Sequence, residues 1–352
     1  MIAMFLVTFI LNTTHKEVVL GHTAHRTNMV FAIIVFLPIF ISAAMRGDIG
    51  DTWAYKLTFK QLPSTVSGLI AYLPKIQKDP GFTILGSIIK LFIGYRPQVY
   101  LAIIAAFQST CLVCAFRKYS SNYLLSIFFF VASTDYLSWM FNGMRQFLAV
   151  TIIFAATSFM VRKKWLPALA FILLASTFHQ SALIMIPILF IVQGKAWNKK
   201  TLLFLTITLA AVLFIDGFTD ILEDLMADTQ YKNVVSDWKY YQDDGTNIVR
   251  VLVYSVPALI SLLEIKKIRS LDDPLINFCT NASIVTMGIY IVSIFTSGIY
   301  IGRLPIYTSL YGYILLPWEM NNLFKDRLFR DILVGISVAC YLLFCFIQLQ
   351  TW

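Results

Sequence analysis

Three arginines of this chain are candidates for binding an anion. Arg46, Arg145 and Arg303 each lie at the point where a long apolar run meets its polar flank. A guanidinium beside hydrocarbon is costly unless it has a partner, so an arginine retained in such a place usually has a function. The planar guanidinium fits phosphate oxygens well. The three arginines therefore predict a binding site for an anionic, phosphate-bearing substrate.

The sequence Phe141–Gln146 strengthens this prediction. Arg145 and Gln146 open an apolar run that is predicted to be a helix. Free backbone N–H groups and the helix dipole favour an anion at a helix N-terminus, and Arg145 adds a full positive charge there. Gln146 is expected to donate a hydrogen bond to an oxygen of the same ligand.

Acid–base chemistry has three candidate residues. His179 lies in the tight link Ser176–Ser181 between two apolar runs, and a histidine can accept a proton near neutral pH. Asp48 and Asp51 belong to Arg46–Tyr55, a segment whose glycines predict a turn. The sequence leaves open which of the three is the base, and His179 is alternatively a phosphate ligand. No metal site and no cofactor are predicted.

Two tyrosines accompany the arginines. Tyr307 follows Arg303 by four residues, which places both on one face if the segment is helical. Tyr55 ends the turn that begins at Arg46. Both tyrosines are predicted to orient the substrate. The alternative is that they belong to the aromatic belt of a membrane interface.

The elements that must position these residues are membrane helices. The chain has 352 residues, of which 58% are hydrophobic and 13% charged, and its mean hydropathy is +0.73. Apolar stretches of about 20 residues, the length that crosses a bilayer, recur from end to end. We predict an all-α polytopic membrane protein, a single integral membrane domain over 1–352 with about 12 transmembrane helices. The predicted spans are approximately 1–12, 28–45, 98–116, 121–141, 145–161, 165–178, 181–194, 201–216, 247–263, 275–297, 304–319 and 331–350.

The basic residues set the predicted orientation. The net charge is +9, but most basic residues form short clusters between apolar runs, which is the positive-inside pattern and argues against a nucleic-acid partner. Consecutive clusters are separated by two apolar runs, so all can face the cytoplasm, together with a loop that holds Lys16 and Arg26. Both termini and the three arginines are then outside. The clusters are Arg117/Lys118, Arg162/Lys163/Lys164, Lys195/Lys199/Lys200, Lys266/Lys267/Arg269 and Lys325/Arg327/Arg330.

Three further segments complete the predicted topology. Residues 46–80 form an outer loop with an amphipathic segment. Residues 81–94 are short for a span and contain Lys90, so we predict a re-entrant or interfacial helix there. Residues 217–246 form an outer loop rich in acidic and aromatic residues. Such a loop suits sugar binding, and the alternative is an ordinary solvated loop.

Taken in order, these motifs resemble the EpsG family of bacterial exopolysaccharide proteins, which is similar to the Wzy O-antigen and capsule polymerases. The resemblance runs from the second span to Tyr307. A departure is Asp79-Pro-Gly-Phe82, where the family more often has glutamate, and no role is assigned to Asp79. The markers are Arg46…Gly50-Asp51…Tyr55, Asn142…Arg145-Gln146, His179 with Ser181, and Arg303…Tyr307.

The resemblance implies a glycosyltransferase at the outer leaflet of the bacterial cytoplasmic membrane. Such an enzyme joins oligosaccharide repeat units carried on undecaprenyl diphosphate, moving the growing chain from its lipid diphosphate to the next lipid-linked unit. Arginines are then expected to neutralise the charge that develops on the leaving diphosphate, in place of a metal. A flippase and a chain-length regulator are the partners that the resemblance implies.

Three other functions remain open. A ligase that transfers finished glycan to another acceptor would share the donor chemistry. A flippase or transporter of lipid-linked sugars would need charge along a cavity that is reachable from both faces, whereas the arginines gather on one face. A membrane acyltransferase with His179 as its base would need a donor from the cytoplasm, while His179 is predicted to lie outside.

Overall fold

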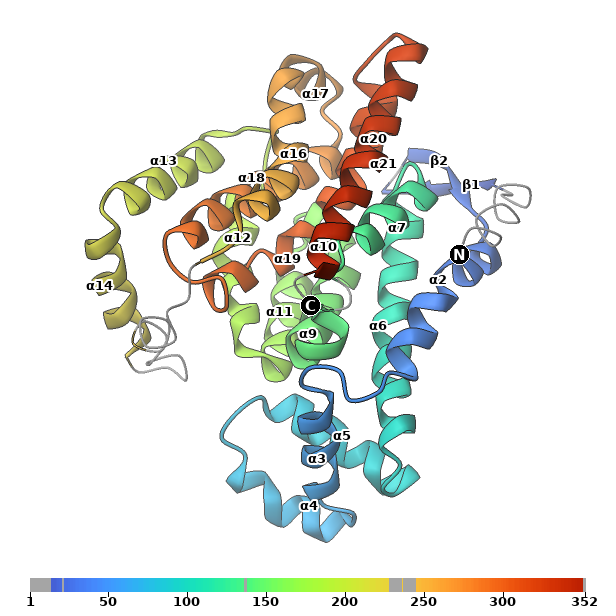
Figure 1. Cartoon of the computed structure of the whole chain (residues 1–352), viewed down its shortest axis with the longest axis vertical. Coiled ribbons are helices and arrows are strands. Elements are labelled where there is room, and N and C mark those ends of the chain that lie inside the picture. The colour runs from blue at the N-terminus through green and yellow to red at the C-terminus, as the bar shows by residue number, and fades with distance from the viewer. Residues whose placement is uncertain (1–13, 21, 136–137, 228–235, 237–244, 351–352) are drawn as a thin grey trace. The chain divides into compact units, whose positions relative to one another are not determined.

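A computed structural model describes most of the chain, which divides into two compact units, 1–183 and 184–352. The predicted span 1–12 lies outside the described residues, and the prediction of one integral domain stays a prediction. The described residues are 14–20, 22–135, 138–227, 236 and 245–350 (Figure 1).

The first unit is mostly helical. Its helices are α2 (Met29–Ala44), α3 (Thr52–Gln61), α4 (Val66–Tyr72), the 3-10 turn Leu73–Lys75, α5 (Pro80–Ile93), α6 (Pro97–Tyr119), α7 (Tyr123–Ala132), the π-helix Ser138–Asn142, α9 (Met144–Ala155), α10 (Thr157–Val161) and α11 (Trp165–Phe178). A 3-10 helix, Gln180–Ile184, leads into the second unit.

The second unit is helical as well, which confirms the predicted helical class for the greater part of the chain. Its helices are α12 (Met185–Ile191), α13 (Lys199–Leu213), α14 (Ile215–Met226), α16 (Ile248–Leu263), α17 (Ile265–Leu271), α18 (Pro274–Ile294), the 3-10 turn Ile301–Arg303, α19 (Ile306–Ser309), α20 (Gly312–Asn322) and α21 (Arg327–Gln350).

A β-hairpin is the exception to the all-α prediction. Strands β1 (Thr14–Val19) and β2 (His22–Thr27) pair antiparallel, where the sequence predicted only a loop. The hairpin is tied to α6 by Arg117, whose Nε donates to the carbonyl of Thr27 and whose Nη2 lies 2.7 Å from the Glu17 carboxylate. Strand β1 (THKEVV) mixes charged residues with threonine and valine, and β2 (HTAHRT) mixes histidine and arginine with threonine and alanine, so no clean alternation marked them in the sequence.

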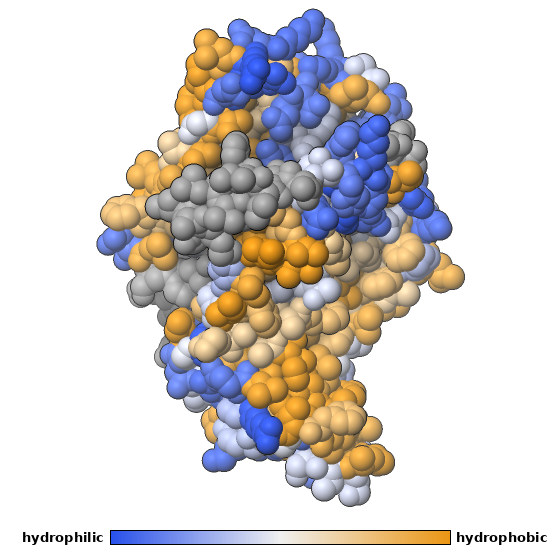
Figure 2. All heavy atoms as spheres, turned by 90° about the vertical axis from the view of Figure 1, so that its right-hand side faces the viewer, coloured by the Kyte–Doolittle hydropathy of each residue, from blue (hydrophilic) through white to orange (hydrophobic). Residues whose placement is uncertain are grey.

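Several helices are long and apolar enough to cross a membrane. Among the described residues these are α6, α18 and α21, and the number rises to five if the bent pairs α13–α14 and α16–α17 each count as one span. Shorter apolar helices such as α2, α9 and α11 accompany them. Large hydrophobic side chains are widely exposed, and Figure 2 shows them on the face that carries α2. The chain is therefore a membrane-integral helical protein, while the count of about 12 spans stays a prediction.

The segment 81–94 forms helix α5, and Lys90 has a structural role in it. The ammonium of Lys90 donates to the carbonyls of Lys60 and Leu62 at the C-terminal end of α3. Unpaired carbonyls at a helix end favour a cation, so Lys90 fastens α5 to α3. The re-entrant or interfacial position of this helix stays a prediction.

One hydrophobic cluster holds the elements that carry the candidate site. Phe59 of α3, Phe82 of α5, Tyr100 of α6 and Leu148 of α9 are buried together. The rings of Phe59 and Tyr100 stack with their centroids 4.2 Å apart. Figure 1 shows α3, α4 and α5 grouped at one end of this unit. The packing fixes the turn after α2 against the start of α9.

In the second unit, α18 is the central helix. Asn281 of α18 accepts a hydrogen bond from the backbone N–H of Trp197 and donates to the carbonyls of Val192, Gly194 and Lys195. Asn277 and Arg269 bond to the same link at Ala196 and Trp197, so these three side chains together hold the connection between α12 and α13. The predicted acidic and aromatic loop 217–246 begins within α14, and its residues 228–235 and 237–244 lie outside the described residues.

Candidate functional site

The site is built around Arg46, which follows the last turn of α2. Its guanidinium is buried, with the residue 4% exposed. The Nη1 atom donates to the carbonyl of Ala43 at 2.7 Å, and Nε donates to the hydroxyl of Thr52 at 3.2 Å. The Nη2 atom lies 3.1 Å from the sulfur of Met144, and the ring of Phe141 lies beneath the guanidinium.

All these partners of Arg46 are neutral. Among the described residues, no carboxylate lies within ion-pair distance of its guanidinium. Burial lowers the pKa of Arg46 to about 10, so the group still carries its charge at neutral pH. A buried charge without a counter-charge is expensive, because the protein does not replace the lost hydration fully. The site therefore favours an anionic ligand.

The turn after Arg46 is locked to the π-helix before α9. Gly50 has φ +52°, and a Cβ there would lie 1.6 Å from Oδ1 of Asn142. That same oxygen accepts a hydrogen bond from the backbone N–H of Asp51. Glycine adopts this conformation without the usual steric cost, and only a residue without a Cβ permits so close an approach. Asn142 thus joins two motifs that are 91 residues apart.

Tyr55 lies at the same junction. Its hydroxyl donates to the carbonyl of Asn142 at 2.8 Å, and its ring packs edge-on against Phe82. Burial raises the pKa of Tyr55, and the nearby Arg145 opposes the rise. Tyr55 is therefore a neutral hydrogen-bond donor that helps to fix the N-terminus of α9 beside Arg145.

Arg145 forms an ion pair that the sequence did not predict. Its Nη1 lies 2.7 Å from Oδ2 of Asp79, the residue that precedes α5. The side chain of Asp79 is 1% exposed, whereas that of Arg145 is 36% exposed. The pair therefore anchors one edge of the guanidinium inside the protein and leaves other N–H groups towards solvent, where they can meet a ligand.

The backbone around Asp79 is arranged for this contact. Asp79 has φ +50° in the left-handed region, which costs roughly 1–2 kcal/mol for a residue with a Cβ and which aspartate tolerates better than most. A Cβ on Gly81 would lie 2.3 Å from Oγ1 of Thr177, so the start of α5 packs closely against the end of α11. Asp79 is thereby brought next to the segment that contains His179.

The Asp79 carboxyl is in an unusual electrostatic state. Burial raises its pKa, while the charges of Arg145 and Lys78 and the backbone N–H of Gln180 oppose that rise. Its Oδ1 atom is buried and has no hydrogen-bond partner among the described residues. Asp79 is a site residue to which the sequence alone assigned no role; its only local signal was an aspartate before Pro-Gly at a helix start.

His179, Ser181 and Gln146 form a hydrogen-bonded row. The Nδ1 atom of His179 lies 2.7 Å from Oγ of Ser181, and Nε2 of Gln146 donates to the same hydroxyl at 3.3 Å. His179 ends α11, and its ring is half-buried. The predicted pairing of Gln146 with a ligand oxygen stays a prediction, since the structure shows its contact with Ser181.

The two candidate aspartates differ from His179. Asp48 is exposed and forms an ion pair of 2.7 Å with Lys56. Asp51 is also exposed, and although it precedes α3, its side chain makes no capping hydrogen bond. Of the three candidates, His179 is the one that belongs to the hydrogen-bonded row beside Arg145.

Arg303 and Tyr307 belong to the second unit. Arg303 ends a 3-10 turn and is exposed, whereas Tyr307 in α19 is 1% exposed. The structure thus brings together Arg46, Tyr55, Arg145, Gln146 and His179 in the first unit. The participation of Arg303 and Tyr307 in the same site stays a prediction.

The arrangement in the first unit suits the binding of an anion next to a group that can transfer a proton. It offers two cationic groups, one buried and one half-exposed, and a histidine that can exchange a proton. Among the described residues, no three His, Cys, Asp or Glu side chains group as a metal site would require.

Comparison with known proteins gives one match. The model of the EpsG family matches residues 29–351, which is nearly the whole chain and includes every residue of the site described above. No curated protein and no solved structure matches the chain.

Proposed function

The chain belongs to the EpsG family, and we propose that it is a polysaccharide polymerase acting on lipid-diphosphate-linked sugars. Membership indicates a polymerase-like role in exopolysaccharide synthesis and hence a glycosyltransferase in the general sense. The proposal adds the donor and the acceptor: both are oligosaccharide repeat units on undecaprenyl diphosphate. The reaction takes place at the outer leaflet of the bacterial cytoplasmic membrane.

One observation carries the proposal: Arg46 is buried and charged, and Ala43, Thr52, Met144 and Phe141, which contact its guanidinium, are neutral. A transferred sugar leaves behind a diphosphate that gains negative charge as the glycosidic bond breaks. A preorganised cation stabilises that charge without reorganising in the transition state. Arg46 is held by Ala43 and Thr52 for this purpose, so its contribution is greatest when the diphosphate develops its full charge.

Arg145 supplies the second cation. Its anchored edge faces Asp79, and its remaining N–H groups can bind phosphate oxygens in the bidentate manner that guanidinium favours. The N-terminus of α9, where Arg145 stands, adds backbone N–H groups and the positive end of the helix dipole. Together they form one side of a diphosphate clamp.

His179 is the residue we assign as the base. In the tautomer with a proton on Nδ1, that N–H donates to Ser181, and Nε2 is the basic atom. Nε2 then takes the proton from the acceptor hydroxyl. At the same time the oxygen of that hydroxyl attacks the anomeric carbon of the donor, and the bond from this carbon to the lipid diphosphate breaks. Asp48 is less suited, because its carboxylate is exposed and engaged with Lys56.

Arg303 and Tyr307 lie in the second unit, and their proposed roles rest on the sequence motifs. Arg303 is proposed as a third diphosphate ligand and Tyr307 as an orienting residue, in keeping with the order of motifs from which they were predicted. A flippase that delivers the lipid-linked units and a chain-length regulator are the proposed partners.

The test is a reconstituted assay with the purified protein and a lipid-diphosphate-linked repeat unit. We expect a ladder of product sizes on a gel, and its loss in Arg46→Met. Absence of a ladder together with movement of the same lipid across the bilayer would overturn the polymerase and support a flippase. A single transfer to a different acceptor would support a ligase.

A further inference from the structure

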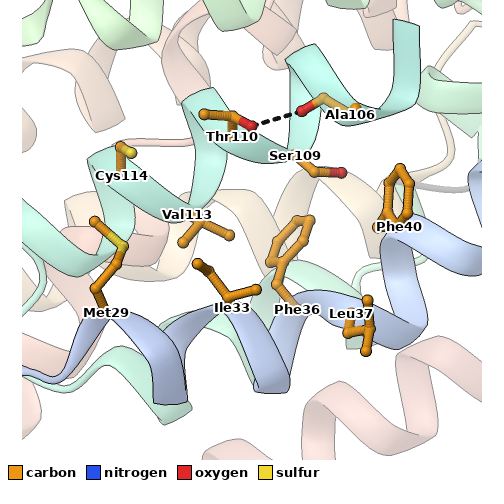
Figure 3. Close-up of a pocket in the computed structure, with 10 residues that line it drawn as sticks. All are labelled: Met29, Ile33, Phe36, Leu37, Phe40, Ala106, Ser109, Thr110, Val113 and Cys114. Atoms are coloured by element: carbon orange, nitrogen blue, oxygen red, sulfur yellow. Dashed lines mark hydrogen bonds between the residues drawn. The ribbon is translucent and has the colours of Figure 1, made fainter. Parts of the chain in front are cut away.

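A hollow in the first unit lies between α2 and α6. It has a volume of about 290 Å³, and ten residues line it, five from each helix (Figure 3). Met29 faces Cys114 at one end of the hollow, and Phe40 faces Ala106 at the other. Seven of the ten are aliphatic, aromatic or methionine side chains, so the hollow is an apolar groove.

The groove is open along its side. Met29, Ile33 and Leu37 of α2 are 37–50% exposed, and Ala106 of α6 is exposed as well. Figure 2, which faces the side that carries α2, shows hydrophobic residues at the level of that helix and hydrophilic ones at the level of the hairpin. From Met29 to Phe40 the groove follows about 16 Å of helix at 1.5 Å per residue. An elongated, flexible apolar molecule fits such a shape.

The groove leads to the candidate site along the same two helices. Ala44, the last residue of α2, lies about 6 Å of helix beyond Phe40, and Arg46 follows directly. At the start of α6, the amide of Gln98 donates to the carbonyl of Arg46 at 3.0 Å. Exposed apolar side chains, Ile41 of α2 and Ile103 of α6, continue along the helices between the groove and this end.

We propose that this groove binds the polyprenyl tail of the lipid-linked substrate, an inference that rests on the proposed function. A lipid diphosphate held by Arg46 and Arg145 has its tail attached near the end of α2, and the groove begins about 6 Å of helix away, at Phe40. A cationic head site joined to an apolar groove matches an amphiphile with an anionic head and a long tail. Confinement of the tail would also fix the direction in which the diphosphate leaves.

One polar group in the wall favours an unsaturated tail. The hydroxyl of Ser109 is buried and has no hydrogen-bond partner among the described residues, and it stands in the groove wall between Phe36 and Phe40. The double bonds of a polyprenyl chain present π electrons to such a hydroxyl, whereas a saturated acyl chain offers no acceptor. One contact of this kind is weak, but it discriminates between the two chains.

The test uses the full chain in nanodiscs and two diphosphates without sugar, undecaprenyl and farnesyl diphosphate. Ala106→Trp fills the groove, and Ala170→Trp is the matched control, since Ala170 is an exposed alanine of α11 outside the groove. We expect the wild type and Ala170→Trp to prefer the long chain by about tenfold or more. In Ala106→Trp the affinity for undecaprenyl diphosphate should fall to that for farnesyl diphosphate, and the affinity for farnesyl diphosphate should equal that of the wild type.

A second variant guards against misfolding of the first. Ser109→Ala removes one hydroxyl, and we expect it to lower the preference for undecaprenyl over a fully hydrogenated chain of equal length by about twofold. The groove assignment is overturned if Ala106→Trp keeps the wild-type preference for the long chain. It is also overturned if a photoreactive phosphatidylglycerol labels the groove and undecaprenyl diphosphate does not displace it.

Binding of the two diphosphates to the wild type distinguishes an error in the proposed function from an error in the groove assignment. If the wild type binds neither diphosphate, the proposed function is wrong and the groove loses its substrate. If the wild type binds both with equal affinity, the head site stands and the groove proposal alone is wrong.

Discussion

Asp79 and Arg145 stand 66 residues apart in the sequence and meet in an ion pair of 2.7 Å, with the carboxylate almost wholly buried. The pair holds one edge of an arginine whose other edge is available to a ligand. A buried aspartate in such a pair reduces the net charge of the site while it fixes the direction of the guanidinium. We therefore regard Asp79 as a positioning residue for Arg145.

Asp79→Asn is predicted to lower kcat by about tenfold or more, because the guanidinium loses its charged anchor and no longer points at the developing diphosphate charge. KM should change less than kcat, or fall, since Asp79 no longer competes with the substrate for the guanidinium of Arg145. Asp79→Glu keeps the charge and should recover part of the activity. The measurement is the initial rate of ladder formation at several substrate concentrations.

Asp331→Asn is the matched control for this series, because Asp331 forms an exposed i,i+4 pair with Arg327. Such pairs contribute little, and its rate should equal that of the wild type. A wild-type kcat in Asp79→Asn would show that Asp79 does not act through Arg145.

The raised pKa of Asp79 predicts a pH dependence of stability. A carboxyl whose pKa is higher in the folded than in the unfolded protein binds its proton more tightly in the folded state. The free energy of unfolding therefore falls as the pH rises from the ordinary value of 3.8 through the raised one. Asp79→Asn removes this contribution. The melting temperature of the variant minus that of the wild type should therefore increase as the pH rises through this interval. Parallel melting curves over the interval would contradict the prediction.

The buried charge of Arg46 is predicted to lower the stability of the folded protein while it serves the reaction. Arg46→Met removes a buried charge that has no carboxylate near it among the described residues, so the melting temperature should stay level or rise while polymerisation is lost. Arg117→Met is the comparison, because Arg117 is buried and bonded to Glu17 and Thr27. Its loss should destabilise the protein by roughly 1–3 kcal/mol. Equal destabilisation in both variants, measured by thermal unfolding in detergent, would sink this interpretation of Arg46.

Gly50→Ala is predicted to disrupt the junction between the two motifs. The added Cβ would collide with Asn142, and φ +52° is unfavourable for alanine by roughly 1–2 kcal/mol. We expect lower stability and a loss of activity greater than the loss of folded protein. Gly47→Ala is the control, since no atom lies within 4 Å of a Cβ at that position. Similar activity of the two variants would show that the Gly50–Asn142 contact does not shape the site.

The sequence was sufficient to propose the three arginines, whose role as diphosphate ligands stays a prediction, because a guanidinium at the edge of an apolar run is visible from local composition alone. The same holds for helices such as α6, predicted at 98–116 and observed at Pro97–Tyr119. Local patterns also located His179 in the link after α11. These features depend on residues that are neighbours in the chain.

The features that the sequence did not reveal depend on distant residues. Nothing near Asp79 indicates that Arg145 will reach it, and nothing near Gly50 indicates Asn142. The neutral surroundings of Arg46 likewise become visible only when Met144 and Phe141 are packed against it. The hairpin Thr14–Thr27 was missed because its mixed residues carry no strict alternation, and its partner Arg117 lies in another element.

The most direct test of the central claim is the affinity of the purified protein for undecaprenyl diphosphate compared with undecaprenol, in the wild type and in Arg46→Met. The two lipids differ only in the diphosphate, so their ratio isolates the contribution of the charged head. We predict that the wild type prefers the diphosphate by about 100-fold and that Arg46→Met loses most of this preference. An unchanged preference in Arg46→Met would contradict the assignment of this buried arginine to the diphosphate.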